Sequence, residues 1–202
     1  GGWDNFELSN SGARMRSYFG TYTINHSSDA SVRWLSHGTT MHGMQLRDQP
    51  RLPISYYGET SGVGLAWQRA EELYGTEATL GVVGLGTGTL ACYKKPGQIL
   101  HYFEIDPLMI EIARDRKIFS FLEKCAPDTK MHLGDARLTL AEQPAGMFDM
   151  LAIDAFSSDS IPLHLLTKEA FEVYRRALKP DGLLLVHISN RHFDLNPVIA
   201  AE

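Results

Sequence analysis

The middle of the chain contains a glycine-rich turn directly after a short apolar segment, residues 79–84. Glycines in this turn allow positive φ angles and let a ligand approach the backbone closely. Their G-x-G-x-G spacing lacks the last interval of the dinucleotide fingerprint, whose third glycine packs helix against strand behind a pyrophosphate. The turn is therefore predicted to bind a nucleoside without a phosphate, and its spacing disfavours a nicotinamide dehydrogenase. Its predicted binding residues are Gly84, Gly86, Thr87 and Gly88.

An acid stands at the end of the next predicted strand. Glu104 closes the segment 98–104, about 20 residues after the first glycine. A carboxylate at this strand tip can accept hydrogen bonds from both hydroxyls of a ribose. The alternative is an ordinary solvated acid at a strand end. Asp106 stands directly before Pro107 and is expected to cap the following helix rather than to bind a ligand.

A third motif, Gly134-Asp135-Ala136, follows the predicted strand 130–133. The Asp135 carboxylate can accept a hydrogen bond from the amino group of an adenine, and Gly134 leaves room for a flat ring beside Ala136. Asp135 could instead only cap the helix that follows. Parallel strands bring their carboxyl ends to one edge of the sheet, where open α/β sheets bind ligands. The order of the three motifs therefore predicts an adenosine site.

Two further acids follow the predicted strand 148–154: Asp154 at its tip and Asp159 on the loop beyond. An alkylammonium group has a pKa of about 10, and only its neutral form attacks carbon. A carboxylate can position the amine and accept its proton as the new bond forms, while in-line alignment supplies most of the acceleration. The two acids are therefore predicted to act on a small-molecule amine. The alternatives are a cap or turn role for Asp159 and a structural role for Asp154.

The hydrophobic pattern predicts the elements that position these residues. Near-continuous apolar strands that alternate with helices imply a parallel sheet covered on both faces. The predicted strands are 79–84, 98–104, 130–133, 148–154 and 182–189, and the predicted helices are 63–73, 89–95, 107–119, 135–142 and 167–178. Three short strands upstream, 18–24, 31–36 and 39–46, predict an antiparallel unit. The predicted fold is α/β, with a small β unit in residues 1–57 and a doubly wound, mostly parallel sheet in residues 58–202.

Composition narrows the class of partner. The net charge of −5 and the absence of a basic stripe argue against nucleic acid and suit a cationic substrate such as a polyamine. No apolar run of about 18 residues predicts a membrane span in this chain, and no signal peptide is visible. Cys92 and Cys125 are expected to be reduced thiols, which favours a cytoplasmic location. The eight histidines lack metal-ligand spacing, so no metal is predicted, and His101 and His187 are expected in the core.

On these motifs the chain resembles the spermidine synthase family of aminopropyltransferases, most closely the bacterial branch often joined to membrane-spanning segments. The resemblance covers roughly residues 16–195 and also includes the stretches 37–45 and 55–57. It implies a Rossmann-like methyltransferase fold, decarboxylated S-adenosylmethionine as co-substrate, a polyamine acceptor such as putrescine and, by analogy, a homodimer. The parent protein is expected to be longer, with a truncated carboxyl end here and membrane-spanning segments outside this chain. By this resemblance Gln45 would contact the cofactor, Glu104 would bind its ribose and Asp135 its adenine. Asp154 would accept the proton of the acceptor amine, and Tyr56 and Asp159 would shape its pocket.

The chain departs from the family pattern at two residues, and its loop after Asp154 is longer than the usual one of the family. Thr87 stands where the family carries an aspartate that grips the aminopropyl ammonium, and Tyr57 stands where the family has histidine. An aspartate would repel the carboxylate of intact S-adenosylmethionine, whereas threonine would not. Three hypotheses therefore stay open: aminopropyl transfer, a methyl or other alkyl transfer from intact S-adenosylmethionine, and a cofactor-binding domain without catalysis.

Overall fold

The computed structural model describes residues 12–155 and 162–187, and these residues form two sheets. The first sheet is antiparallel, with strand order β1-β2-β3-β4. Its strands are β1 (Ala13–Arg16), β2 (Thr21–His26), β3 (Val32–His37) and β4 (Thr40–Leu46). All four precede residue 57, where the sequence predicts a boundary, and the boundary itself stays a prediction.

The second sheet is parallel, with strand order β7-β6-β5-β8-β9. Its strands are β5 (Thr79–Val83), β6 (Ile99–Glu104), β7 (Lys130–Leu133), β8 (Phe148–Ile153) and β9 (Leu178–Val186). The chain order reverses between β5 and β8, so the crevice for a ligand is expected above the carboxyl ends of these strands. The predicted α/β fold with a five-stranded sheet is confirmed.

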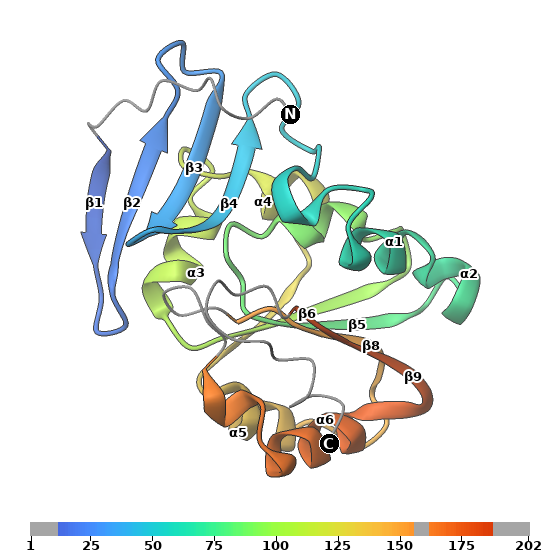
Figure 1. The fold of residues 1–202 in the computed structure, drawn as a ribbon. Helices are drawn as coiled ribbons and strands as arrows, with labels where there is room; N and C mark the ends of the chain where they lie inside the picture. Colours follow the sequence, from blue (N-terminus) through green and yellow to red (C-terminus); the bar gives the residue numbers. More distant parts are fainter. Residues whose placement is uncertain (1–11, 156–161, 188–202) are drawn as a thin grey trace.

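Helices cover both faces of the parallel sheet (Figure 1). One side carries α1 (Gly62–Gln68), α2 (Ala70–Tyr74), α3 (Pro107–Arg114) and α4 (Phe121–Cys125), and the other carries α5 (Ala136–Ala141) and α6 (Lys168–Ala177). Short 3-10 helices lie at η1 (Ser55–Tyr57), η2 (Thr89–Tyr93) and η3 (Leu163–Leu165). The strands alternate their apolar side chains between two cores, with Val82 packed on one face and Val83 on the other. Burial on both faces explains why these strands read as continuous apolar runs.

Buried polar contacts join the antiparallel sheet to the end of β6. The hydroxyls of Tyr22 and Ser17 both donate to Asp106 Oδ2, at 2.7 and 2.5 Å. Burial and the neighbouring Asp106 raise the pKa of Tyr22, so its hydroxyl keeps its proton and remains a donor. Asp106 Oδ1 also accepts from Leu108 N–H, which confirms the predicted cap of α3. The Asp106 carboxylate therefore caps α3 and also binds the antiparallel sheet to the end of β6.

Two helices are shorter than predicted. The predicted helix 63–73 is broken at Arg69 into α1 and α2. The predicted helix 107–119 ends at Arg114, because the Asp115 carboxylate accepts from Lys117 N–H and turns the chain toward α4. Side-chain bonds of this local kind compete with helix continuation. None of the described helices is long and apolar enough to cross a membrane.

The expectation of two reduced thiols is wrong. Cys92 of η2 and Cys125 of α4 form a disulfide, with Cα atoms 4.7 Å apart, and no described cysteine is free. The two residues lie 33 positions apart and meet because α4 packs against η2. Disulfides are rare in reducing compartments, so the cysteines no longer support a cytoplasmic location, which stays a prediction.

His101 lies in the core as predicted, with 6% of its surface exposed. Its ring stacks on His132, and the two rings share a hydrogen bond of 2.8 Å. Burial, together with the charges of His132 and Lys130, lowers the pKa of His101 to about 4.

This buried imidazole predicts a loss of stability in mild acid. Between pH 6.5 and about 4 the unfolded chain binds a proton at His101 that the folded chain does not, so the free energy of unfolding falls as pH falls. The loss has an upper limit of about 3.5 kcal/mol, since the shift is about 2.5 pKa units and one unit corresponds to about 1.4 kcal/mol. Urea unfolding across this range should show a shallower decline for His101→Phe. An equal decline in both proteins would contradict the assignment.

Candidate active site

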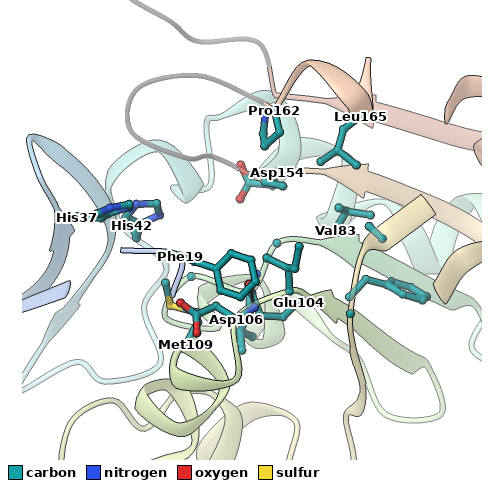
Figure 2. A pocket seen from close by; sticks show the side chains of 18 of the residues that line it. Phe19, His37, His42, Val83, Glu104, Asp106, Met109, Asp154, Pro162 and Leu165 are labelled. Carbon is teal, nitrogen blue, oxygen red and sulfur yellow. Dashed lines mark hydrogen bonds between the residues drawn. The ribbon is translucent and has the colours of Figure 1, made fainter. Parts of the chain in front are cut away.

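A cavity of about 280 Å³ lies above the carboxyl ends of the parallel strands. We call it the strand-tip cavity. Its lining includes Gly84, Gly86, Glu104, Gly134, Ala136 and Asp154 from the parallel sheet and its loops, and Tyr22, His37 and His42 from the antiparallel sheet. Figure 2 shows His37 and His42 on one side, Glu104 and Asp106 on another, and Asp154 across from them. The cavity therefore joins residues of all three predicted motifs with a second sheet.

The glycine turn is shaped for close backbone contact. Gly84 has φ +94° and Gly86 has φ +52°, conformations that favour glycine. A Cβ on Gly84 would stand 2.5 Å from the Asp154 carbonyl oxygen, and one on Gly86 would stand 2.5 Å from the carbonyl oxygen of His42. These two glycines are required because the turn is pressed between β8 and β4.

Glu104 lies buried at the tip of β6, as predicted. Its two oxygens accept from the backbone N–H groups of Leu85 and Asp106, each at 2.9 Å. Burial raises the pKa of Glu104, and the two backbone N–H bonds oppose that shift. Each carboxylate oxygen can accept more than one hydrogen bond, so Glu104 can hold the glycine turn and still accept from a ligand hydroxyl.

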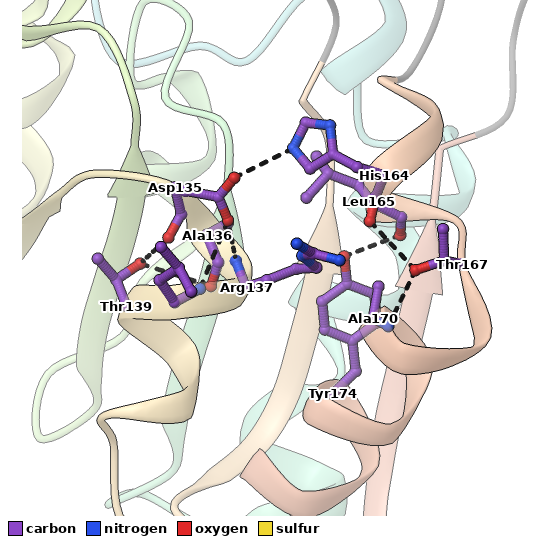
Figure 3. Close-up of polar contacts among 10 residues, drawn as sticks. Asp135, Ala136, Arg137, Thr139, His164, Leu165, Thr167, Ala170 and Tyr174 are labelled. Atoms are coloured by element: carbon purple, nitrogen blue, oxygen red, sulfur yellow. Dashed lines mark hydrogen bonds and ion pairs between the residues drawn. The ribbon is translucent and has the colours of Figure 1, made fainter.

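Asp135 is the N-cap of α5, where its Oδ1 accepts from Arg137 N–H at 2.9 Å. Its Oδ2 faces His164 Nε2 at 3.3 Å (Figure 3). Gly134 and Ala136 line the strand-tip cavity, whereas Asp135 itself does not. The capping role that the sequence left open is therefore present, and the adenine contact stays a proposal.

Two side chains contact the carboxylate of Asp154, one at each oxygen. Tyr57 donates its hydroxyl to Asp154 Oδ2, and His187 Nδ1 lies 2.6 Å from Asp154 Oδ1. A carboxylate partner means that the proton of the neutral imidazole sits on Nδ1. Burial and the nearby Asp154 raise the pKa of Tyr57 well above its ordinary value, so Tyr57 acts as a donor.

A second cavity, of about 330 Å³, lies on the other side of Asp154. Tyr56, Asp154 and His187 line it, together with apolar residues of α1, β8 and β9. The Tyr56 ring packs against His187 at a centroid distance of 5.1 Å, and its hydroxyl donates to the carbonyl of Met41 at 3.3 Å. Asp154 lines both cavities and so stands at their boundary.

Besides Asp135, and Tyr56 of the second cavity, three more predicted residues do not line the strand-tip cavity. Thr87 is fully buried, with its hydroxyl 2.9 Å from that of Thr89, and Gly88 opens η2 in a left-handed conformation. Gln45 faces away, and its amide bonds to Ser120 and to the carbonyl of Pro50. Asp159 lies outside the described residues.

The sequence did not assign the residues that hold Asp154. His187 was expected in the core, but its side chain is 27% exposed and meets Asp154 just beyond β9. That expectation is wrong, because β9 ends at Val186, three residues before the predicted end of the strand, and the His187 ring lies in the site. Tyr57 enters the sequence analysis only as a departure from a family pattern. No local signal marks His187, because the predicted strand 182–189 includes it.

The chain is similar in sequence to curated aminopropyltransferases. No protein-family model matches the chain. It is 30% identical over 113 residues to a polyamine aminopropyltransferase of Vibrio vulnificus, covering 52% of this chain and 36% of that protein. It is 33% identical over 89 residues to a spermine synthase of Arabidopsis thaliana, covering 43% of this chain and 24% of that protein. The chain thus matches about a third or less of the length of these curated relatives.

Solved structures show the same fold. A probable spermidine synthase from Corynebacterium glutamicum superposes with a TM-score of 0.72 at 19% identity, over 88% of this chain and 64% of that one. A spermidine synthase in complex with the transition-state analogue AdoDATO superposes with a TM-score of 0.60 at 16% identity, over 94% of this chain and 62% of that one. The membrane-fused branch stays a prediction. The resemblance to spermidine synthases that the motifs predict is confirmed, in sequence by the aminopropyltransferase relatives and in fold by these structures.

Proposed function

We propose that this chain is the nucleoside-binding and catalytic part of a spermidine synthase-like enzyme. It would transfer an aminopropyl group from decarboxylated S-adenosylmethionine to an amine such as putrescine. The observation that carries the proposal is the position of Asp154, a buried carboxylate at the boundary between two cavities. One cavity has the motifs expected for an adenosine, and the other leads an acceptor to the same carboxylate. The aminopropyltransferase relatives support this chemistry.

The strand-tip cavity is proposed to hold the adenosine half of the co-substrate. Glu104 would accept from the ribose hydroxyls, and the backbone at Gly134 and Ala136 would face the purine. Three carboxylates, Glu104, Asp106 and Asp154, line the cavity and favour the positive sulfonium. Figure 2 shows how these acids surround the open space.

The transfer itself needs an amine nitrogen in line with the carbon–sulfur bond. The nitrogen lone pair forms a new bond to the propyl carbon next to sulfur, and the carbon–sulfur pair returns to sulfur and leaves methylthioadenosine. The attacking nitrogen becomes positive and gives its proton to Asp154. Tyr57 and His187 fix both oxygens of that carboxylate, so the acceptor of the proton is already oriented.

A second candidate, transfer from intact S-adenosylmethionine, is favoured by one observation. Thr87 is buried against Gly43 and Thr89, so the glycine turn presents no side-chain carboxylate to an aminopropyl ammonium. His37 and His42 line the cavity instead and would not repel a substrate carboxylate.

The Asp154→Asn variant tests the catalytic proposal. Asparagine keeps the shape but accepts no proton, so turnover of decarboxylated S-adenosylmethionine with putrescine should fall by at least about 100-fold. Methylthioadenosine release, followed by chromatography, measures the rate. The matched control is Asp128→Asn, the same change at an exposed acid, which should keep full activity. Equal rates in Asp154→Asn and wild type would refute the role.

The Glu104→Gln variant tests the ribose contact. Loss of a charged hydrogen-bond acceptor should weaken methylthioadenosine binding roughly 10- to 100-fold in calorimetry. Glu111→Gln, on the exposed face of α3, is the control and should bind normally. An unchanged dissociation constant in a folded Glu104→Gln protein would remove Glu104 from the site.

A competition between the two co-substrates separates the candidate functions. The aminopropyl proposal predicts tighter binding of decarboxylated S-adenosylmethionine and release of methylthioadenosine in the presence of an amine. Tighter binding of the intact compound, with S-adenosylhomocysteine as product, would overturn it in favour of the second candidate. Binding of either compound without turnover of any amine would instead support the non-catalytic hypothesis.

A further inference from the structure

A group of positively charged side chains lies apart from the strand-tip cavity and from the second cavity. An open hollow of about 540 Å³ lies between β3 and β4 of the antiparallel sheet and the turn that joins α3 to α4. We call it the basic hollow. Its lining contains Arg33, Arg47, Arg116, Lys117 and Lys124, and no carboxylate among the described residues that form it. It shares no lining residue with the strand-tip cavity.

Backbone carbonyls, and no carboxylate within ion-pair distance among the described residues, hold Arg33 in place. Its Nη1 donates to the backbone carbonyls of Lys117 and Ile118, which orients the guanidinium between the two segments. Its Nε is buried and has no hydrogen-bond partner among the described residues. Burial lowers the pKa of Arg33, and only the charge of Asp115 opposes that shift. No described carboxylate forms an ion pair with Arg33, so its positive charge is offset only by Asp115, which lies beyond ion-pair distance.

The other cations add to this charge. Arg116 has one ion pair, with Glu123 at 3.8 Å, and both side chains are at least half exposed, so the pair is weak. Within the described residues, Arg47, Lys117 and Lys124 form no ion pair. The whole chain is acidic, with a net charge of −5, so this concentration of positive charge is not an average property of its surface.

The Gln45 amide holds two walls of the basic hollow together through hydrogen bonds. Its Nε2 donates to Pro50 carbonyl at 2.8 Å and to Ser120 Oγ at 3.2 Å, and its Oε1 accepts from Ser120 N–H at 3.2 Å. These bonds fasten β4 to the start of α4, and the bonds of Arg33 fasten β3 to the preceding turn. The cations therefore lie on two parts of the fold that are fastened together, the antiparallel sheet and the segment from the α3–α4 turn into α4, which lowers the cost of ordering them around a ligand.

We propose that the basic hollow binds a phosphate-bearing anion. Guanidinium and ammonium groups pair strongly with phosphate oxygens, and an anion in the hollow would supply the close ion-pair partner that Arg33 lacks among the described residues. The site is separate from amine transfer and does not depend on the function proposed above. A soluble oligophosphate and an anionic lipid headgroup present the same chemistry.

Calorimetry with pyrophosphate, at low and at physiological salt, tests the proposal. The expected result is saturable binding that weakens as salt rises. The double variant Arg47→Gln/Lys124→Gln changes two exposed side chains that support no hydrogen bond of the described fold, and it should weaken binding at least tenfold. The matched control Arg69→Gln/Lys95→Gln removes the same charge from exposed positions elsewhere and should leave binding unchanged.

Sedimentation with vesicles of phosphatidylcholine, with and without phosphatidylserine, identifies the source of the phosphate. Binding to the anionic vesicles alone, lost in the Arg47→Gln/Lys124→Gln protein, supports a lipid headgroup. Pyrophosphate binding alone supports a soluble ligand. Binding of neither, or equal weakening by both double variants, overturns the proposal. The Asp154→Asn protein should bind pyrophosphate normally, so failure here is distinct from failure of the proposed transfer activity.

Discussion

Two adjacent carboxylates at the end of β6 hold the candidate site together. Glu104 accepts from the backbone of Leu85 in the glycine turn, and Asp106 accepts from Tyr22 and Ser17 of the antiparallel sheet. The walls of the strand-tip cavity come from these same segments. A buried carboxylate left without its donors would cost several kcal/mol, so the turn and the sheet are constrained to stay in register with β6. The shape of the cavity depends on this pair.

Asp154 adds a constraint of a different kind. Tyr57 reaches it from η1 and His187 from the end of β9, so its carboxylate ties together segments from both halves of the chain. Such a network fixes orientation rather than fold, since β8 is already buried on both faces. An oriented carboxylate between two cavities suits a reaction in which a proton leaves one substrate as it attacks another.

Much of this could be predicted from the sequence, because the motifs and strands are local patterns. Glu104 and the glycine turn follow from strands that end at a common edge. The contact of Tyr57 with Asp154 spans 97 positions, and the Cys92–Cys125 disulfide spans 33, so both depend on packing that no local pattern specifies. His187 is misplaced because the predicted strand runs three residues past the end of β9, and element ends are the least certain part of a prediction from sequence. The basic hollow is lined by residues from 26–50 and from 116–124, so its cations come together only in the fold, and the net charge of −5 gives no sign of them.

The proposed activity requires an unphosphorylated adenosine across the tips of β5, β6 and β7. A crystal structure of the protein soaked with methylthioadenosine would locate it. We expect the ribose hydroxyls within hydrogen-bond distance of Glu104, about 2.5–3.0 Å, and the purine beside Gly134 and Ala136. Electron density for the nucleoside at any other place, with the strand-tip cavity empty, would contradict it.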